Sequence, residues 1–552
     1  MTDVLLAHAF FLKNDPKQAE KMRPYAPLGT LYAASGVRSR GYSVALFDAM
    51  LAAGEEEFTA LLAAHRPRFV VLYEDQFNFL NKMCLAHARQ AACRMARRAR
   101  QAGATVLAAG SEVTDHPEIY LGQGVDYALL GEADHSLIEL LDALAGRTGR
   151  QVDTIAGLAL PDPGAPAGLR RTAPRPPDRH PDVFPYPAWD LLDVERYRAA
   201  WRRAHGYYSV NLVTTRGCPF HCNWCAKPIW GQRYAMRSPA SVAEEMALVK
   251  RQLAPDHVWF ADDIFGLQPR WVSALAAEMA LVQRTLAPDH VWFADDIFGL
   301  QPKWVAELGR EVEARGVRIP FTIQSRADLM TEVAVEGLSR AGCAEVWLGA
   351  ESGSQKILDA MDKGTRRAQI PVARQRLAQA GIRACYFLQL GYPGETFGDI
   401  AATLQLVRET LPDAIGVSVS YPLPGTRFHA MVAASLGAKN HWDDSADLAM
   451  MFQGTYQTAF YRELHGLLHR DLELRHRLAR AGAASVAAAD AANAAGAADT
   501  AAAAAAAAEL AAVEARFAEL GRDEARYRSL HPTAIEQGRG PLAAPDLSQP
   551  WN

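Results

Sequence analysis

The sequence lacks the features that mark membrane, secreted and nucleic-acid-binding proteins. No uncharged apolar run approaches the length of about 18 residues that crosses a bilayer. The first residues, MTDVLLAHAFF, have neither the cationic head nor the long apolar run of a signal peptide. The net charge is −4 at pH 7, and no Lys/Arg-rich tract offers a surface for phosphates. We therefore expect a soluble, cytoplasmic protein with no membrane span and no nucleic-acid partner.

Cysteine is also scarce, with seven residues in a chain of 552. An odd number of cysteines without a secretion signal does not indicate a disulfide framework. Four of them, Cys84, Cys93, Cys343 and Cys385, stand in apolar helical or strand contexts, where cysteine usually serves as a small buried side chain. The other three fall within eight residues and need their own explanation.

The first 146 residues alternate short apolar runs with helical patterns. The expected strands cover residues 4–11, 42–50, 69–77, 104–113 and 126–133. This alternation predicts an α/β fold, with a Rossmann-like domain at residues 1–146 whose parallel sheet is covered by helices. Ligands of such sheets bind at the carboxyl ends of the strands. The candidate binding residues there are Asp48, Tyr73, Asp75, Gly110, Ser111, Gly131 and Glu132.

A linker and a second α/β region are expected to follow. The proline density over residues 147–190 predicts no regular element, so we interpret residues 147–207 as a Pro-rich linker. From 208 to 430 the alternation resumes, which predicts a partial (β/α) barrel with its site at the carboxyl strand ends. Its expected strands cover residues 208–215, 257–263, 321–328, 344–351, 383–391 and 414–422.

A tandem duplication interrupts the expected barrel within about residues 246–305. The segment that begins at Met246 recurs from Met279, 33 residues later, with only three differences. Solenoid repeats need at least three divergent copies, so two nearly identical copies indicate a recent duplication or an error in the gene sequence. The barrel then has one helix-plus-strand unit too many, and the sequence leaves open which copy supplies the working strand.

The last part of the chain, residues 431–552, is expected to be helical. It contains an alanine-rich tract that favours helix but offers few large apolar groups to bury. We expect this tract to form a marginal helix or a flexible spacer with no chemical role.

The three clustered cysteines carry the strongest chemical signal. Cys218, Cys222 and Cys225 form a Cys-x3-Cys-x2-Cys pattern directly after a predicted strand. Three thiolates on one loop can hold three irons of a [4Fe–4S] cluster, which leaves the fourth iron open to chelate an amino group and a carboxylate. Gly217 and Pro219 suit a tightly wrapped loop.

A structural zinc site is the main alternative for these cysteines. A structural zinc ion requires four protein ligands in a tetrahedral arrangement, and the sequence offers no second Cys-x2-Cys pair to complete such a set. His221 stands inside the loop, between two of the cysteines, which makes it an awkward fourth ligand.

The cysteine pattern resembles the defining motif of the radical S-adenosylmethionine (SAM) superfamily. Trp224, before the last cysteine, matches an aromatic residue that lies beside the adenine in that family. The resemblance implies one-electron reduction of SAM at the open iron, giving methionine and a 5′-deoxyadenosyl radical. It also implies SAM-binding positions at the later strand ends. These are Asp262 and Asp263 with their duplicates Asp295 and Asp296, then Gln324, Arg326, Glu351, Ser352, Gly391 and Pro393.

A Rossmann-like domain before such a barrel resembles the cobalamin-binding subfamily of radical SAM enzymes. The segments YAPLGTLYAAS and GEADHSLIELLDAL resemble its Pro-Leu-Gly and closing Gly-Glu elements. Many cobalamin domains carry Asp-x-His-x-x-Gly, but the corresponding stretch from Asp48 to Gly54 has no histidine. This departure predicts cobalt without a protein imidazole on its lower face. The usual Gly-Gly-Pro-His turn is replaced at residues 109–112, so a degenerate domain without cobalamin remains the alternative.

These resemblances imply a cobalamin-dependent radical SAM enzyme, similar to class B radical SAM methyltransferases, that transfers a methyl group to an unactivated centre of a small-molecule substrate. A reducing partner such as a flavodoxin or ferredoxin is expected. An oxidative cyclase or rearrangement enzyme, similar to the anaerobic magnesium-protoporphyrin monomethyl ester cyclase, would use the same cofactors. A cobalamin- or cluster-binding sensor without turnover is the alternative of another class.

Overall fold

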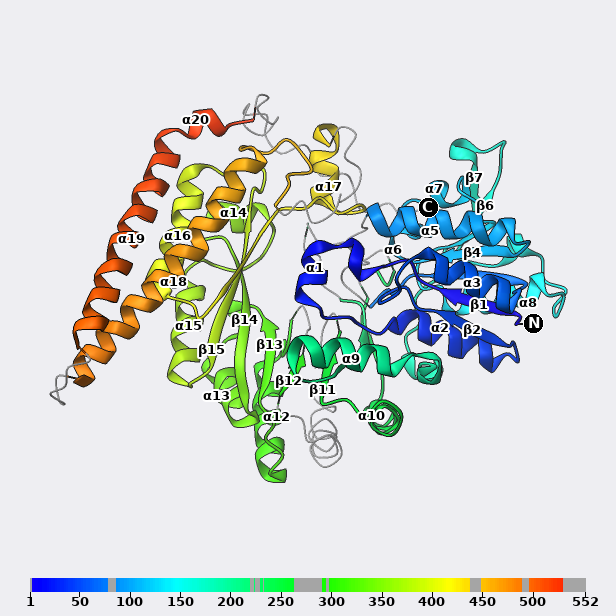
Figure 1. Cartoon of the computed structure of the whole chain (residues 1–552), viewed down its shortest axis with the longest axis horizontal. Helices are drawn as coiled ribbons and strands as arrows, with labels where there is room; N and C mark the ends of the chain where they lie inside the picture. The colour runs from blue at the N-terminus through cyan, green and yellow to red at the C-terminus, as the bar shows by residue number, and fades with distance from the viewer. Residues whose placement is uncertain are drawn as a thin grey trace.

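Two seven-stranded sheets, one in each half of the molecule, dominate the computed structural model (Figure 1). The structure describes residues 2–77, 86–218, 223, 229–231, 233–262, 290–293, 297–436, 448–488 and 496–529. The predicted fold class is confirmed, because both sheets are mainly or wholly parallel and a helical region follows them.

The N-terminal sheet has the strand order β2-β1-β3-β4-β5-β6-β7. Its strands are β1 (Val4–Ala7), β2 (Val44–Phe47), β3 (Phe69–Tyr73), β4 (Thr105–Ala109), β5 (Tyr127–Leu129), β6 (Leu158–Pro161) and β7 (Leu169–Arg171). The first five are the strands expected from the sequence, and they pair in parallel. Their carboxyl ends therefore lie along a single edge of the sheet.

Helices cover both faces of this sheet, because alternate strand residues point to opposite sides. Helices α2 (Leu28–Ser39) and α8 (Asp134–Leu144) pack on one face, while α3 (Glu55–His65) and α5 (Ala86–Gln101) pack on the other. Shorter helices follow strand ends, namely α1 (Pro16–Lys21), α6 (Ser111–Asp115) and α7 (Pro117–Leu121).

The prediction that residues 147–190 contain no regular element is wrong. Strands β6 and β7 form an antiparallel pair that extends the sheet beyond β5. Pro161 ends β6 at an exposed position, and proline is tolerated at such strand ends because no ladder hydrogen bond is lost there. The prolines crowd instead into the stretch from 174 to 187, where no strand is formed.

The second sheet is parallel throughout and has the order β16-β15-β14-β13-β12-β11-β8. Its strands are β8 (Ser209–Leu212), β11 (His257–Phe260), β12 (Val291–Phe293), β13 (Phe321–Ser325), β14 (Cys343–Glu351), β15 (Arg383–Leu390) and β16 (Ile415–Val419). Its helices are α10 (Pro239–Leu253), α12 (Pro302–Arg315), α13 (Glu332–Ala341), α14 (Gln355–Ala360), α15 (Gln369–Gln379), α16 (Phe397–Thr410) and α17 (Arg427–Val432).

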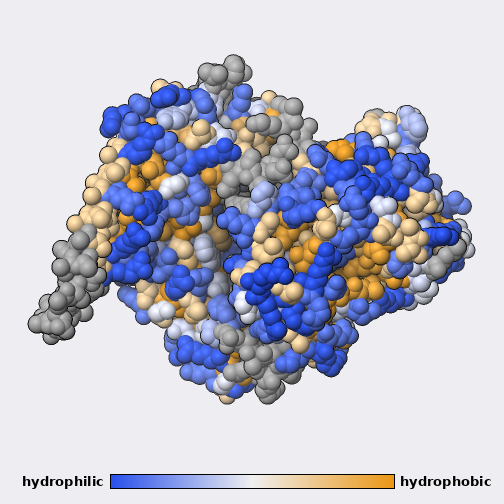
Figure 2. Space-filling model, viewed as in Figure 1, coloured by the Kyte–Doolittle hydropathy of each residue, from blue (hydrophilic) through white to orange (hydrophobic). Residues whose placement is uncertain are grey.

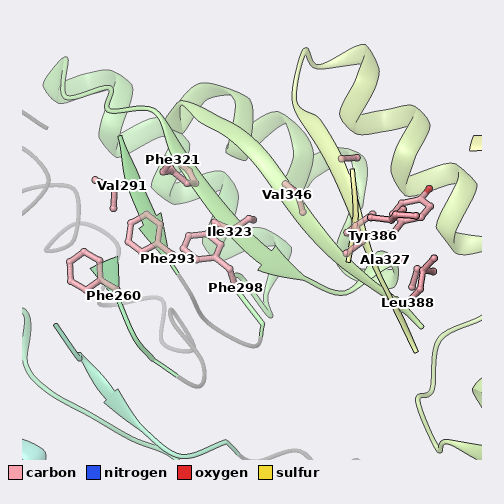
Figure 3. Close-up of a cluster of buried hydrophobic side chains, with 14 of the residues drawn as sticks. Phe260, Val291, Phe293, Phe298, Phe321, Ile323, Ala327, Val346, Tyr386 and Leu388 are labelled. Carbon is pink, nitrogen blue, oxygen red and sulfur yellow. The ribbon is translucent and has the colours of Figure 1, made fainter. Parts of the chain in front are cut away.

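Both copies of the duplicated segment contribute a strand to this sheet. Strand β11 belongs to the first copy and β12 to the second, and identical residues pair across them, as in Val258 with Val291. Phe260 and Phe293 stack with ring centroids 5.4 Å apart, inside the core (Figure 3). The duplication has therefore widened the sheet by one strand.

The two halves of the molecule pack against each other. Helix α9 (Val194–His205) joins them, since Trp201 Nε1 donates to the Pro24 carbonyl (2.8 Å) and Arg198 donates to the Leu253 carbonyl (2.8 Å). A single buried apolar cluster contains Leu28 and Tyr32 of the N-terminal half together with the strands of the second sheet.

The C-terminal helices α18 (Thr458–Ala488), α19 (Gly496–Arg522) and α20 (Glu524–Tyr527) follow the second sheet. The alanine-rich tract is helical in α19, which packs along α18 through Leu474, Ala506 and Val513 (Figure 1). Polar side chains cover much of the visible face, with apolar patches between them (Figure 2). Among the described helices, none combines the length and apolar character that a membrane span needs.

Candidate functional site

The cysteine loop leaves the second sheet after β8 and returns beside its own starting point. Strand β9 (Thr215–Arg216) pairs with β10 (Ala235–Met236) in an antiparallel bridge that closes the loop. Gly217 adopts φ +77°, and a Cβ there would lie 2.3 Å from the carbonyl oxygen of Arg233. Glycine is therefore required where the two arms approach, and the next residue, Cys218, is 4% exposed.

Asp262, at the end of β11, anchors the start of this loop. Its carboxylate accepts hydrogen bonds from the backbone N–H groups of Thr214 (2.6 Å) and Thr215 (2.8 Å) and from the Thr214 hydroxyl (2.5 Å). Asp262 is 3% exposed, so these bonds compensate the cost of burying its charge. The structure thus places this predicted site residue against the cysteine loop.

The next predicted charges form ion pairs beside the strand ends. Arg326 binds both carboxylate oxygens of Asp328 at 3.0 Å and donates to the Lys363 carbonyl at 2.9 Å. Lys363 Nζ lies 2.7 Å from Glu351 Oε1, and Glu351 itself adopts φ +56°. The ends of β13 and β14 are therefore joined through the loop that carries Lys363. Gln324, the fourth residue of β13, is half-buried.

Ser352, Gly391 and Pro393 lie at the ends of β14 and β15. Ser352 is fully buried and contacts the Thr403 hydroxyl at 3.2 Å, so it fastens the strand end to α16. Gly391 adopts φ +75° and donates its N–H to Glu395 Oε2 (2.6 Å), and the turn continues through Pro393. Burial raises the pKa of Glu395 to about 8.

Several predicted residues lie outside the described residues. They are Cys222, Trp224, Cys225, Asp263, Asp295 and Asp296. Their roles stay predictions.

The carboxyl edge of the N-terminal sheet gathers buried polar side chains at the ends of β1, β2 and β3. His8 follows β1, and its Nε2 lies 2.8 Å from Oδ1 of Asp48, which follows β2. Burial opposes the charged form of His8, but the Asp48 hydrogen bond and nearby carboxylates raise its pKa overall. Glu74 follows β3, and burial raises its pKa to about 7. Asp75 accepts from the N–H of Gly29 (2.9 Å) at the start of α2.

The remaining predicted residues of this edge lie at or just beyond the ends of β3, β4 and β5. Tyr73 OH donates to Asp134 at 3.2 Å. Gly110 has φ +146°, and a Cβ there would lie 2.8 Å from the Glu74 Cβ, so β4 ends in close contact with β3. Ser111 is buried, and Gly131 donates its N–H to the Thr114 hydroxyl (3.0 Å).

A buried ion pair joins this edge to the cysteine loop. Arg216, two residues before Cys218, pairs with Glu132, three residues after the end of β5. The side chains are 4% and 3% exposed, and Trp230 Nε1 also donates to Glu132 (3.2 Å). Glu132 is among the candidates expected from the sequence, and Glu74 lies between the candidates Tyr73 and Asp75, whereas Arg216 and His8 are not among them. His8 lies inside the run of residues 4–11 that is expected to form a strand, and only the structure shows that β1 ends at Ala7, so the sequence alone did not mark His8 as a strand-end residue.

Comparison with known families assigns the second half of the chain. Residues 212–407 match the Radical SAM superfamily. The match lies in the second sheet and runs from the end of β8 through β15. The matched region begins on β8, contains the cysteine loop and ends in α16, so the expectation of a [4Fe–4S] cluster and SAM follows from the family.

Relatives extend the likeness beyond the radical SAM domain. The chain is 26% identical to an uncharacterized methyltransferase of Pyrococcus horikoshii over 58% of this chain and 61% of that protein. It is 23% identical to the anaerobic magnesium-protoporphyrin IX monomethyl ester cyclase of Rubrivivax gelatinosus, over 54% of this chain and 48% of that protein. The chain thus spans less than two thirds of the length of these two relatives.

Solved structures show the same arrangement of both halves. The radical SAM methyltransferase TsrM of Kitasatospora setae matches with a TM-score of 0.56 and 18% identity, over 79% of this chain and 77% of that chain. The cobalamin-dependent SAM radical enzyme OxsB matches with a TM-score of 0.53 and 16% identity, over 75% of this chain and 52% of that chain. At these identities the likeness shows the fold alone.

Proposed function

We propose that this chain is a cobalamin-dependent radical SAM methyltransferase that acts on a small-molecule substrate. The observation that carries the proposal is the buried pair of Arg216 and Glu132. It brings the carboxyl edge of the N-terminal sheet, where Rossmann-like folds bind ligands, to the loop that begins at Cys218. Two cofactor sites next to each other are what methyl transfer between them requires.

The residues at both sites fit the proposed cofactors. Cys218 is the described member of the cluster-binding set, and the tight turn at Gly217 holds it beside Arg216; Cys222 and Cys225 complete the set. On the N-terminal edge, the described polar atoms without a hydrogen-bond partner include His8 Nδ1, Glu74 Oε2 and Ser111 Oγ. Buried polar atoms without partners cost about 1–3 kcal/mol each, so a bound polar ligand at this edge would stabilise the domain.

When bound, the cluster would supply the electron for reductive cleavage of SAM, and cobalamin would supply a carrier for the methyl group. The protein residues have positioning tasks. Asp262 fixes the start of the cysteine loop, and the Lys363–Glu351 pair fixes the end of β14. The proposed SAM contacts of Asp262, Asp263, Gln324, Arg326, Glu351, Ser352, Gly391 and Pro393 rest on the resemblance to the family.

An oxidative cyclase is the second candidate function. The similarity to the magnesium-protoporphyrin IX monomethyl ester cyclase favours it, because that relative covers about as much of this chain as the methyltransferase does. Both functions use a small-molecule substrate, and both need a one-electron donor, for which we propose a flavodoxin or ferredoxin in the cytoplasm.

Anaerobic reconstitution with iron, sulfide and hydroxocobalamin tests the proposal. After addition of methyl-labelled SAM and dithionite, we expect bound cobalamin, 5′-deoxyadenosine and labelled methylcobalamin. Cys222→Ala should abolish 5′-deoxyadenosine formation, whereas Cys93→Ala, which changes a buried cysteine on α5, should not.

Each contrary result has a distinct meaning. Cleavage of SAM without bound cobalamin would overturn methyl transfer by this route and leave a radical SAM enzyme. Bound cobalamin that never acquires label, with an oxidised product, would favour the cyclase. Absence of 5′-deoxyadenosine from the wild type would favour a sensor.

A further inference from the structure

The second sheet has one face that packs against helices and an inner face that does not follow this pattern. On the packed face, Phe293 contacts Phe298, which contacts Trp304 of α12, with ring centroids 5.2 and 5.5 Å apart (Figure 3). Side chains alternate along a strand, so Trp292, the neighbour of Phe293, points to the inner face. Trp292 is half-buried there.

Four aromatic side chains share the inner face, and we call them the aromatic row: Trp259 of β11, Trp292 of β12, Trp347 of β14 and Phe387 of β15. Their register positions differ by even numbers of residues, which places them on one face. Gln324 of β13 pairs with Trp347 and therefore lies on the same face, in the middle of the row. All five side chains are half-buried, so each keeps some accessible surface.

The rings of the aromatic row form two stacked pairs. Trp259 and Trp292 stack with ring centroids 5.3 Å apart and planes 7° apart, and Trp347 and Phe387 stack at 4.8 Å and 27°. Each pair stacks across neighbouring strands, so the second faces of Trp292 and Trp347 are turned toward β13 from its two sides. Two strand spacings separate these indoles by about 10 Å, with Gln324 between them. This spacing suits a flat ring inserted between two indole faces.

The composition of this face differs from that of a filled barrel. In closed (β/α) barrels the inward positions hold branched side chains packed in layers. Here they hold large flat rings with accessible surface, and the row continues over Gly416 of β16. A Cβ on Gly416 would lie 3.2 Å from the Phe387 ring, so a larger residue there would press on that ring.

The aromatic row lies below the strand ends to which we assign SAM. On the same face, Arg326 is two residues beyond Gln324, and Glu351 is four residues beyond Trp347. At about 3.3 Å per residue, the row is roughly 7–13 Å below these ends. A ring held on the row is therefore close to the site proposed for SAM.

The N-terminal half closes one end of the row. Tyr25 contacts the edge of Trp259, with ring centroids 4.4 Å apart. The next residue, Ala26, exchanges two hydrogen bonds with the side chain of Asn211 on β8, both at 3.1 Å. The row therefore begins next to the half of the molecule to which we assign cobalamin.

We propose that the substrate is a planar, conjugated ring system that inserts between Trp292 and Trp347, with the Gln324 amide hydrogen-bonded to a polar atom on its edge. The inference rests on the proposed function, because it names the substrate class of that site. Stacked aromatic rings attract each other beyond the effect of buried area, which a saturated ring of the same size does not reproduce. Small-molecule sites combine such aromatic surfaces with a few polar groups that fix orientation.

Isothermal titration calorimetry of the reconstituted full chain with two matched probes tests the proposal. The probes are 2-naphthoate and decahydro-2-naphthoate, which share a carbon skeleton and a carboxylate, but only the first is planar and conjugated. We expect 2-naphthoate to bind about tenfold more tightly, since it stacks on two indoles.

Substitutions in the aromatic row should remove this preference. We expect Trp292→Leu and Trp347→Leu each to weaken 2-naphthoate binding by about three- to tenfold and to leave decahydro-2-naphthoate unchanged. Trp347→Phe keeps a flat ring and should keep most of the preference. The matched control is Phe517→Leu on α19, another half-buried ring, which contacts Phe397 at 5.0 Å and should change neither affinity. Iron content after reconstitution checks that each variant is folded.

Equal affinities for the two probes, no binding of either probe, or full 2-naphthoate affinity in both leucine variants would overturn the inference. The proposed function is measured separately, through 5′-deoxyadenosine and labelled methylcobalamin formed without these probes. Both products together with equal probe affinities would leave the proposed function intact with a substrate of another shape. Preference for 2-naphthoate in protein that forms neither product would overturn the proposed function and leave a site for planar rings.

Discussion

The two copies of the duplicated segment have nearly the same sequence but different neighbours. Strand β11 of the first copy pairs with β8, which leads into the cysteine loop, whereas β12 of the second copy pairs with β13. His257 and His290 occupy equivalent positions. His257 Nδ1 contacts the Ser209 hydroxyl at 2.8 Å, while His290 Nε2 contacts the Thr322 hydroxyl at 2.9 Å.

Position in the sheet, and not local sequence, therefore assigns a role to each copy. Trp259 and Trp292 stack with ring centroids 5.3 Å apart, and Trp259 also contacts Tyr25 of the N-terminal half at 4.4 Å. Asp262, at the end of the first copy's strand, reaches Thr214 and Thr215 because β11 is the direct neighbour of β8. We therefore interpret the first copy as the one that supports the cysteine loop.

The largest expected effect comes from substituting the aspartates that follow the strands of the two copies. Asp262→Ala leaves two buried N–H groups and a hydroxyl near Cys218 without their acceptor, at about 1–3 kcal/mol each. We expect lower iron content after reconstitution and at least a tenfold loss of 5′-deoxyadenosine formation. Asp295 follows β12, which is one strand further from β8 than β11 is. Asp295→Ala should therefore cause a smaller loss of iron and of 5′-deoxyadenosine formation. Equal losses would contradict the assignment of the loop to the first copy.

The paired histidines should differ in their effect on acid stability. Burial, with smaller contributions from His290 and Arg23, lowers the pKa of His257 to about 4. The unfolded chain takes up a proton as the pH falls through about 6.5, while the folded state resists protonation until about 4. The free energy of unfolding should therefore decrease over this window, by up to about 3 kcal/mol.

Urea unfolding of His257→Asn and His290→Asn between these pH values checks the prediction. In His257→Asn, the free energy of unfolding should fall less as the pH is lowered. Burial also lowers the pKa of His290, but the negative charge of Glu345 opposes this shift, so the effect of His290→Asn should be smaller. A pH dependence unchanged in His257→Asn would contradict the neutral buried state of that histidine.

The smallest effect is expected from removing one copy. Deletion of residues 257–289 joins Asp256 to His290 and leaves one strand of this sequence. Because β11 pairs with β8 and β12 with β13 in parallel, the remaining strand can pair with both neighbours at once. We expect folded protein with unchanged iron content, measured after reconstitution. Insoluble protein, or loss of the cluster, would show that the sheet depends on seven strands.

Much of the fold could be predicted because strands in this chain are strongly patterned. The apolar runs that predict strands in both sheets all form strands, and the polar candidates Glu132 and Glu351 lie at or just beyond strand ends. The pair β6 and β7 was missed because its strands are short and its neighbouring prolines dominate the local pattern. Proline is excluded from interior strands but is tolerated in edge strands and at strand ends. A prediction based on proline content alone therefore failed for this pair of strands.

The sequence alone was enough to predict a cluster-binding loop, because Cys218, Cys222 and Cys225 are close along the chain and their spacing can be recognised without knowing the fold. It also predicted the strands of both sheets other than β6, β7 and β12 as working elements of an α/β fold, because local apolar pattern marks such strands. Only the tertiary structure decided which side chains meet across long separations. His8 joins Asp48, Arg216 joins Glu132, and one of two equivalent aspartates joins the cysteine loop. Such contacts depend on strand order, which local sequence does not encode.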